Sequence, residues 1–159
     1  MLTKEDKYWV LVHQFPGFGP AKHRKLLNYF SSMEEIYQSD KAEMQRAGIG
    51  EELAQKFQDF KKTISQEKIL ETIEKEGMGI LKITDTSYPQ LLSQIYDPPF
   101  LLYWKGKLDL NQDLPLAVVG SRKYSAYGEQ VSNSLVPELA KNKMTIISGL
   151  ALGVDALAH

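Results

Sequence analysis

The sequence predicts an α/β protein in two parts: an all-helical domain over residues 1–77, then the first part of a parallel-sheet domain over residues 78–159. Two observations predict this class. In the first part, apolar residues recur three and four positions apart, which is the spacing of amphipathic helices. In the second part, a short apolar strand, a long helical stretch and another strand follow one another, which is the order of a β-α-β unit.

The composition narrows the class of protein. Of the 159 residues, 43% are hydrophobic and 25% are charged, which is the balance of a folded globular chain. We expect no signal peptide, and no apolar run approaches the roughly 18 residues of a membrane helix. Cysteine is absent, which excludes disulfides and thiolate metal sites and suits the cytoplasm. Because the net charge is −1, any surface that binds nucleic acid must be a local one.

Short helices joined by glycine turns make up the first part. Thr3 and Asp6 have the spacing of a capping box at the start of a helix. Two Gly-x-Gly hairpins follow, at 17–19 and 48–50, and each precedes a helix start. This tandem arrangement resembles a SAM-like or helix-hairpin-helix module. The N–H groups at such a helix start point outward and can hold a phosphate without contacting a base.

Basic residues follow only the first hairpin. The candidates for a secondary DNA contact are Gly17, Gly19, Lys22, Arg24 and Lys25. A solvated helix face is the alternative interpretation of this cluster. The second hairpin is followed by Glu51 and Glu52, which would repel phosphate, so we expect it to be structural.

The second part is expected to contain short strands, a short turn of helix over residues 88–95, two further helices and one longer loop. The expected strands are 80–83, 100–104, 116–119 and 145–148, the helices are 126–141 and 154–159, and the loop is 108–115. The strand at 116–119 is apolar throughout, as in the interior of a parallel sheet. Pro137 should kink or shorten the helix that contains it.

Both strands of the β-α-β unit end in a turn that contains glycine. These turns, at 120–122 and 149–153, follow the carboxyl ends of parallel strands, which is the edge where such sheets bind ligands. Their N–H groups and the Arg122 guanidinium can hold a phosphate. The stretch GSRKYSAYG does not fit the dinucleotide fingerprint, and Ser148 stands where an acidic residue would hold a ribose, so NAD is rejected.

The sequence contains no catalytic arrangement that can be defended. Asp155 and His159 are four residues apart on a helix, but no nucleophile stands near them. A capping or core role is expected for Asp155, and mobility for the terminal His159. We therefore expect no catalytic residues, no metal site and no cofactor.

Three segments of the chain resemble one protein family. The runs YPQLLSQIYDPPFLLYWKG, AVVGSRKYSAYG and IISGLALGVDALAH are similar to the DNA processing protein A family, DprA or Smf. The resemblance implies a helical SAM-like module followed by a Rossmann-like domain that binds single-stranded DNA in the bacterial cytoplasm. It also implies protection of incoming DNA in natural transformation, loading of RecA recombinase, and a homodimer.

The resemblance also implies the residues that contact the DNA backbone. They are Gly120, Ser121, Arg122, Lys123, Ser148, Gly149, Leu150, Gly153 and Asp155. Tyr127 either belongs to this site or packs in the core. Leu152 stands where the family frequently has a basic residue, which would weaken the hold on phosphate.

Two further expectations concern the length of the chain and an alternative function. Only about two strands of the doubly wound sheet precede His159, whereas a sheet has ~5–6, so we expect a truncated domain, with the dimer and RecA surfaces in the missing part. The alternative is a nucleotide-binding enzyme, similar to the phosphoribohydrolases, that acts on a nucleoside monophosphate. Their Pro-Gly-Gly-x-Gly-Thr stretch is not found in this sequence. A third option is that the helical domain is a protein-interaction module.

Overall fold

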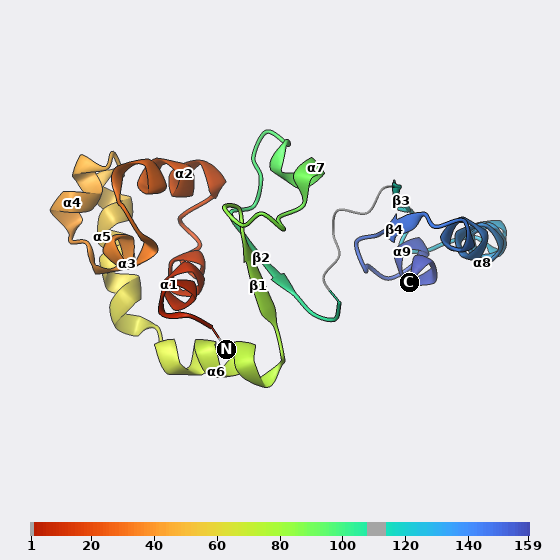
Figure 1. Ribbon diagram of the computed structural model, residues 1–159, viewed down its shortest axis with the longest axis horizontal. Coiled ribbons are helices and arrows are strands. Elements are labelled where there is room, and N and C mark those ends of the chain that lie inside the picture. Colours follow the sequence, from red (N-terminus) through yellow and green to blue (C-terminus); the bar gives the residue numbers. More distant parts are fainter. Residues whose placement is uncertain (1, 108–113) are drawn as a thin grey trace. The chain divides into compact units, whose positions relative to one another are not determined.

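The computed structural model describes residues 2–107 and 114–159. The chain divides into two compact units, Met1–Leu110 and Asn111–His159 (Figure 1). Most of the loop expected over residues 108–115 lies outside the described residues, and its last residue is the first residue of a strand. None of the helices in the described ranges has the length and apolar character needed to cross a membrane.

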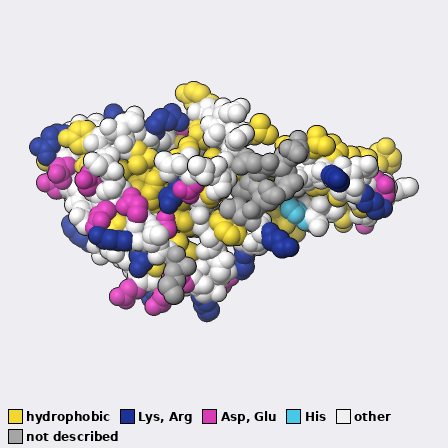
Figure 2. All heavy atoms as spheres, in the orientation of Figure 1, with side chains coloured by type: hydrophobic (Ala, Val, Ile, Leu, Met, Phe, Trp, Pro, Cys, Tyr) yellow, Lys and Arg dark blue, Asp and Glu magenta, His cyan; other side chains and the backbone are white. Residues whose placement is uncertain are grey.

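The first unit combines helices with a small antiparallel sheet. Its elements are α1 (Lys4–His13), α2 (Pro20–Tyr29), α3 (Met33–Gln38), α4 (Lys41–Arg46), α5 (Glu51–Thr63), α6 (Gln66–Lys75), β1 (Gly79–Lys82), α7 (Gln90–Ser93) and β2 (Leu101–Trp104). The pairing of β1 with β2 sets Gly79 opposite Trp104. A side chain at Gly79 would overlap the indole ring of Trp104, so the register requires glycine there. Basic and acidic side chains are interspersed on the visible face of this unit (Figure 2).

Local hydrogen bonds explain where the helices of this unit begin. The capping box predicted before α1 is confirmed, because the Asp6 N–H donates to Thr3 Oγ1 over 3.1 Å and the Thr3 N–H donates to Asp6 Oδ2 over 2.9 Å. A second capping box joins Asp40 and Glu43 at the start of α4. Pro20 occupies the first turn of α2, where its missing N–H would have no partner in a helix.

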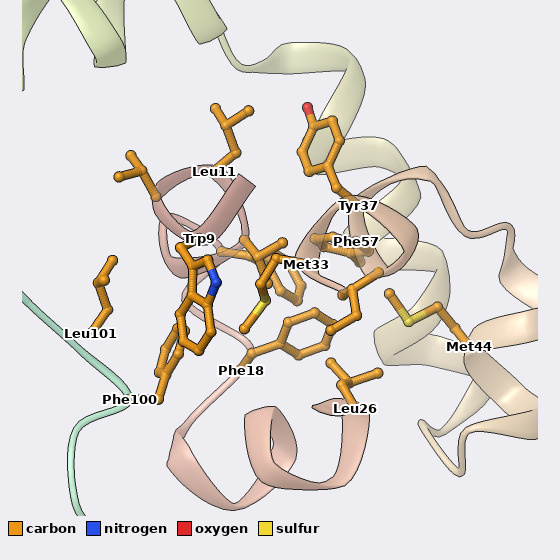
Figure 3. Close-up of a cluster of buried hydrophobic side chains, with 14 of the residues drawn as sticks. Trp9, Leu11, Phe18, Leu26, Met33, Tyr37, Met44, Phe57, Phe100 and Leu101 are labelled. Atoms are coloured by element: carbon orange, nitrogen blue, oxygen red, sulfur yellow. The ribbon is translucent and has the colours of Figure 1, made fainter. Parts of the chain in front are cut away.

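The core of the first unit is a cluster of aromatic and aliphatic side chains drawn in Figure 3. Phe57 of α5 is fully buried, and its ring centroid lies 5.2 Å from that of Phe15 and 4.9 Å from that of Phe18. Phe100 and Leu101, from the start of β2, belong to the same cluster. Because these two side chains complete the helical core, the first compact unit extends beyond residue 77, where the sequence suggested a domain boundary.

A salt bridge also joins the β-sheet to the helices. Lys82 Nζ of β1 lies 2.7 Å from Asp6 Oδ1 of α1, and both side chains are largely buried. Burial raises the pKa of the Asp6 carboxyl, but the hydrogen bonds from Lys82 and Thr3 outweigh it, and the net effect is a lowered pKa. The ion pair therefore stabilises the contact between β1 and α1 above the range in which carboxylates titrate.

His23 of α2 is fully buried in this unit, although it lies within the predicted basic cluster. Its ring stacks on that of Phe100, with centroids 3.3 Å apart, and its Nδ1 lies 3.1 Å from the Gly19 carbonyl oxygen. Its Nε2 has no hydrogen-bond partner within the described part of the chain. Burial lowers the pKa of His23 to about 4. The hydrogen bond with Gly19 raises this pKa and the nearby His13 lowers it, but burial has the largest effect.

We expect the first unit to lose stability in weak acid because of His23. An unfolded histidine titrates near pH 6.5, so below that pH the unfolded chain binds a proton that the folded chain excludes until about pH 4. The free energy of unfolding should fall by about 2–3 kcal/mol over this range on account of this site. Urea unfolding at several pH values should show a shallower dependence in His23→Leu. An equal dependence in both proteins would contradict the assignment.

The second unit is a β-α-β unit followed by a short helix. Its elements are β3 (Pro115–Ala117), α8 (Ala126–Lys141), β4 (Thr145–Ile147) and α9 (Val154–Ala158). The two strands are parallel, with Leu116 opposite Ile146, as the order of elements predicted. The Val118 N–H donates to the Ile147 carbonyl oxygen over 2.9 Å and extends the pairing by one residue.

The structure qualifies two expectations for this unit. Pro137 does not shorten α8, which runs from Ala126 to Lys141 as a single helix. Proline has no N–H to donate to the carbonyl four residues earlier, and α8 continues past this missing hydrogen bond. The strand expected to be buried also has an exposed end, because Val119 is 72% exposed. The described residues pair β3 with β4 alone, so the sheet does not surround this strand.

Candidate phosphate-binding turns

Two turns follow the carboxyl ends of the parallel strands and lie at the same edge of the sheet. The first turn is residues 118–125, between β3 and α8, and the second turn is residues 148–153, between β4 and α9. The first turn ends at Ser125, whose Oγ accepts the Gly128 N–H over 3.1 Å and caps α8. This cap sets where α8 starts relative to the first turn.

The carboxylate of Asp155 joins the two turns to each other. Asp155 is only 8% exposed. The Gly120 N–H of the first turn donates to its Oδ1 over 3.3 Å, and the Gly149 N–H of the second turn donates to its Oδ2 over 3.1 Å. A Cβ at Gly149 would lie 2.8 Å from Asp155 Oδ2, so glycine is needed for this approach. The amides that the sequence suggested for phosphate are therefore already paired.

Gly153 and Val154 bring the second turn against the backbone of the first. The Val154 N–H donates to the Ser121 carbonyl oxygen over 3.1 Å. Gly153 has a φ of +98°, and a side chain there would overlap the Ser121 carbonyl oxygen and the Arg122 backbone. Gly120 is packed as closely, because its Cβ would lie 2.7 Å from the Val154 side chain. The two turns thus interlock as one structure.

Two basic side chains face solvent at this edge. Arg122 and Lys123 are exposed, and neither forms an ion pair within the described ranges. Lys141 of the same unit, in contrast, pairs with Glu138 over 2.6 Å. Two unpaired cations beside a rigid turn can hold one anionic group, and the arginine can contact two of its oxygens at once.

The two serines of the predicted site differ in their availability. Ser121 Oγ accepts the Lys123 N–H over 3.1 Å and donates to the Lys123 carbonyl oxygen over 2.8 Å, so it is engaged in its own turn. Ser148 Oγ is buried and has no hydrogen-bond partner in the described part of the chain. Leu150, in the second turn, has a φ of +52°, which is uncommon for a residue with a side chain.

The residues predicted to contact phosphate in the two turns of the second unit therefore play unequal roles. Gly120, Gly149, Gly153 and Asp155 hold the turns together, while Arg122 and Lys123 remain open to a ligand. A carboxylate that accepts two N–H groups and carries negative charge is a poor direct ligand for phosphate. Within residues 2–107 and 114–159, no group of three or more His, Asp or Glu side chains is placed to hold a metal ion.

Sequence reasoning missed a group of exposed apolar side chains around the turns. The members of this apolar rim are Val119, Tyr124, Tyr127, Leu150 and Leu152. Tyr127 is 76% exposed, so the expectation that it could pack in the core is wrong. Its exposure could have been inferred from the spacing of small and apolar residues in α8, because Ser132 and Val136 mark the buried stripe and Tyr127 lies off it.

The first hairpin of the N-terminal module is only partly open to a ligand. Lys25 donates from Nζ to the Gly48 carbonyl oxygen over 2.8 Å, so its charge supports the second hairpin. A Cβ at Gly17 would lie 2.5 Å from the Phe15 ring, so this glycine is packed in the interior. Gly19 caps α2 through its backbone alone, and Lys22 and Arg24 are exposed. The structure thus leaves two of the predicted basic side chains facing solvent.

Comparisons with known proteins point to one family. Residues 79–159 match the family model described as DNA recombination-mediator protein A. The chain is 29% identical over 164 residues to protein Smf of Synechocystis, covering 100% of this chain and 41% of that protein. It is 37% identical over 93 residues to DNA processing protein DprA of Bacillus subtilis, covering 58% of this chain and 31% of that protein.

A solved structure shares the fold. The crystal structure of DNA processing protein A from Streptococcus pneumoniae superposes with a TM-score of 0.70 at 29% identity. The match covers 100% of this chain and 53% of that one. The chain therefore spans about half of that structure and 41% or less of the curated relatives compared above.

Proposed function

Because the chain belongs to the DNA recombination-mediator protein A family, we propose that its interlocked turns bind the phosphate backbone of single-stranded DNA during DNA uptake. One observation carries the proposal. Arg122 and Lys123 project from a rigid turn at the ligand-binding edge of a parallel sheet, and neither has a carboxylate partner in the described ranges. A pair of unpaired cations on a fixed backbone suits a chain of phosphates.

The proposed contact is electrostatic and carries no sequence information. Arginine and lysine contacts to phosphate position a strand, whereas sequence is recognised through base edges. Asp155 supports the site by accepting hydrogen bonds from the N–H groups of Gly120 and Gly149. These bonds hold the turn that carries Arg122 against the second turn. In this proposal the protein binds single-stranded DNA and catalyses no reaction. It acts in the cytoplasm.

The same proposal includes the wider role that the family resemblance implies. The bound strand would be protected from degradation and handed to RecA recombinase, and the protein would act as a homodimer. None of the described residues is assigned to RecA or to the dimer contact. Lys22 and Arg24 of the first hairpin remain candidates for a secondary contact to the same strand.

We expect Arg122→Ala to weaken binding to every single-stranded sequence to the same extent. Loss of one charge-assisted phosphate contact should reduce the affinity for a thymidine oligonucleotide by roughly 10-fold at low salt. The slope of log affinity against log salt should decrease by about 0.7, which corresponds to one released counterion on a single strand. Fluorescence anisotropy across a salt series measures both quantities.

Lys141→Ala provides the matched control for this prediction. It removes one positive charge from the same unit, but its ammonium pairs with Glu138 at the far end of α8. Its binding should resemble that of the unmodified protein. If Arg122→Ala binds as tightly as the unmodified protein at every salt concentration, Arg122 does not contact the phosphate.

Titration with AMP separates this proposal from the enzyme alternative. A site built for a nucleoside monophosphate should bind AMP saturably and release an oligonucleotide in exchange. A site that relies on several successive phosphates should bind the oligonucleotide and show no competition from AMP at comparable concentration. Calorimetry with both ligands measures the difference.

A further inference from the structure

Exposed apolar side chains gather at the edge that carries the cations. The second turn contributes Leu150, which is 73% exposed, and Leu152, which is 80% exposed. The start of α8 contributes Tyr127, and the first turn contributes Tyr124 and Val119. Figure 2 shows hydrophobic side chains on the surface of this unit, which lies at the right of the view. A site for phosphate alone needs no such surface, because phosphate offers nothing apolar to bind.

The tyrosine rings of this apolar rim have no aromatic partner inside the described residues. The ring contacts recorded there all lie in the first unit, where Phe57 and its neighbours form the core. Tyr127 stands in the first turn of α8, off the stripe that carries buried Val136. The side chain extends from a regular helix and is 76% exposed to solvent.

The chain between the cation and the ring is fixed locally. Arg122 lies in the first turn, and Tyr127 lies in the first turn of helix α8. Ser125, which caps the start of α8, stands between them in the sequence. The Ser121 hydroxyl holds the intervening backbone through the N–H and the carbonyl of Lys123. The cation and the aromatic ring therefore belong to one segment whose backbone is held by local hydrogen bonds.

We propose that Tyr127 stacks on an unpaired base next to the phosphate that Arg122 holds, and that this contact makes the site select single strands. The inference rests on the proposed function. In a duplex, each base face is stacked on its neighbours and unavailable, whereas a single strand exposes an apolar face at every nucleotide. Leu150 and Leu152 supply additional apolar surface from the second turn for sugars and bases.

Leu152 is consistent with a site that contacts bases as well as phosphates. A basic residue there would add one more phosphate contact, whereas the exposed leucine adds apolar surface. Leu152 therefore adds apolar surface to the second turn and no charge.

The experiment compares Tyr127→Ala and Tyr127→Phe on two ligands of the same length. One is a thymidine oligonucleotide, and the other is an abasic oligonucleotide with the same sugar-phosphate chain. Tyr127→Ala should bind the thymidine ligand roughly 10-fold more weakly, which is the usual loss for one stacked base, and the abasic ligand without change. Tyr127→Phe should bind both as the unmodified protein does, because the ring is kept.

Two further variants separate this inference from the proposed function. Arg122→Ala should weaken the binding of both ligands, since both carry phosphates, and failure of that result alone would overturn the phosphate assignment. Tyr96→Ala removes a tyrosine that is 99% exposed in the first unit and should change neither affinity. A loss in Tyr127→Ala that is equal for both ligands overturns the stacking contact, and so does no loss at all.

The experiment also shows whether the apolar rim binds a second copy of the chain instead of DNA. If Tyr127→Ala leaves both affinities unchanged but alters the sedimentation of the free protein, the apolar rim is a contact between copies of the chain and the proposal is wrong. A duplex of the same sequence provides a final comparison. The unmodified protein should prefer the single strand, and Tyr127→Ala should lose most of that preference.

Discussion

Replacing Gly153 by alanine is expected to dismantle the candidate site and to destabilise the second unit by roughly 3–5 kcal/mol. Gly153 has a φ of +98° and a ψ of −138°, a conformation that residues with a side chain avoid. The added methyl group would also overlap the Ser121 carbonyl oxygen and the Arg122 backbone. Because backbone atoms cannot rotate away as a flexible side chain can, the two turns must separate.

Hydrogen exchange is the appropriate measurement for this variant. Both tryptophans, Trp9 and Trp104, lie in the first unit, so their fluorescence does not follow the second unit. The amides of β4 and α9 should lose protection in Gly153→Ala, and DNA binding should disappear with them. Tryptophan fluorescence during urea unfolding should stay unchanged, because the first unit has its own core.

Gly128→Ala is the matched control for Gly153→Ala. Gly128 lies inside α8, and a Cβ there would lie 3.5 Å from Ser125 Oγ, which is an ordinary contact. Alanine should be neutral or stabilise α8 by up to about 1 kcal/mol. If Gly153→Ala retains both protection and DNA binding, the close approach of the two turns is not required for the site.

Replacing Phe57 by alanine is expected to destabilise the first unit by about 3–5 kcal/mol. The ring is fully buried and contacts Phe15 and Phe18, from the connection between α1 and α2, and Tyr37 of α3. Lys61 Nζ also lies 5.2 Å from the ring centroid. Alanine removes these contacts together and leaves a cavity that the surrounding helices cannot close completely.

Urea unfolding followed by tryptophan fluorescence measures this loss, because Trp9 belongs to the same core. Tyr29→Ala is the control, since Tyr29 is 50% exposed at the end of α2. Its effect should stay within about 0.5 kcal/mol, as for most surface substitutions. A loss below about 1 kcal/mol in Phe57→Ala would mean that Phe57 is not central to this core.

The helix starts of this protein were predictable because each depends on a few neighbouring residues. Thr3 with Asp6, Pro20, and Ser125 with Gly128 all form their structures within four positions of the chain. The bounds of α8 agreed with the sequence for the same reason. Pro137, in contrast, does not shorten α8, although a proline inside a helix often ends it.

The extent of the first unit was harder to predict. A change of composition after Gly77 suggested a boundary, but Phe100 and Leu101 lie in the helical core. The contacts of the Phe100 ring with Trp9 and His23 join residues that are distant in sequence. The spacing of apolar residues shows that a strand has a buried face, but it does not identify the element on which that face packs.

The sequence by itself determined that two glycine turns follow parallel strands and that Arg122 lies in one of them. Only the tertiary structure decided which groups are left for a ligand. The Gly120 N–H meets the carboxylate of Asp155 across 35 positions of sequence, and Lys25 meets the Gly48 carbonyl across 23. A spacing pattern records which groups can form hydrogen bonds, but their partners depend on how distant segments pack.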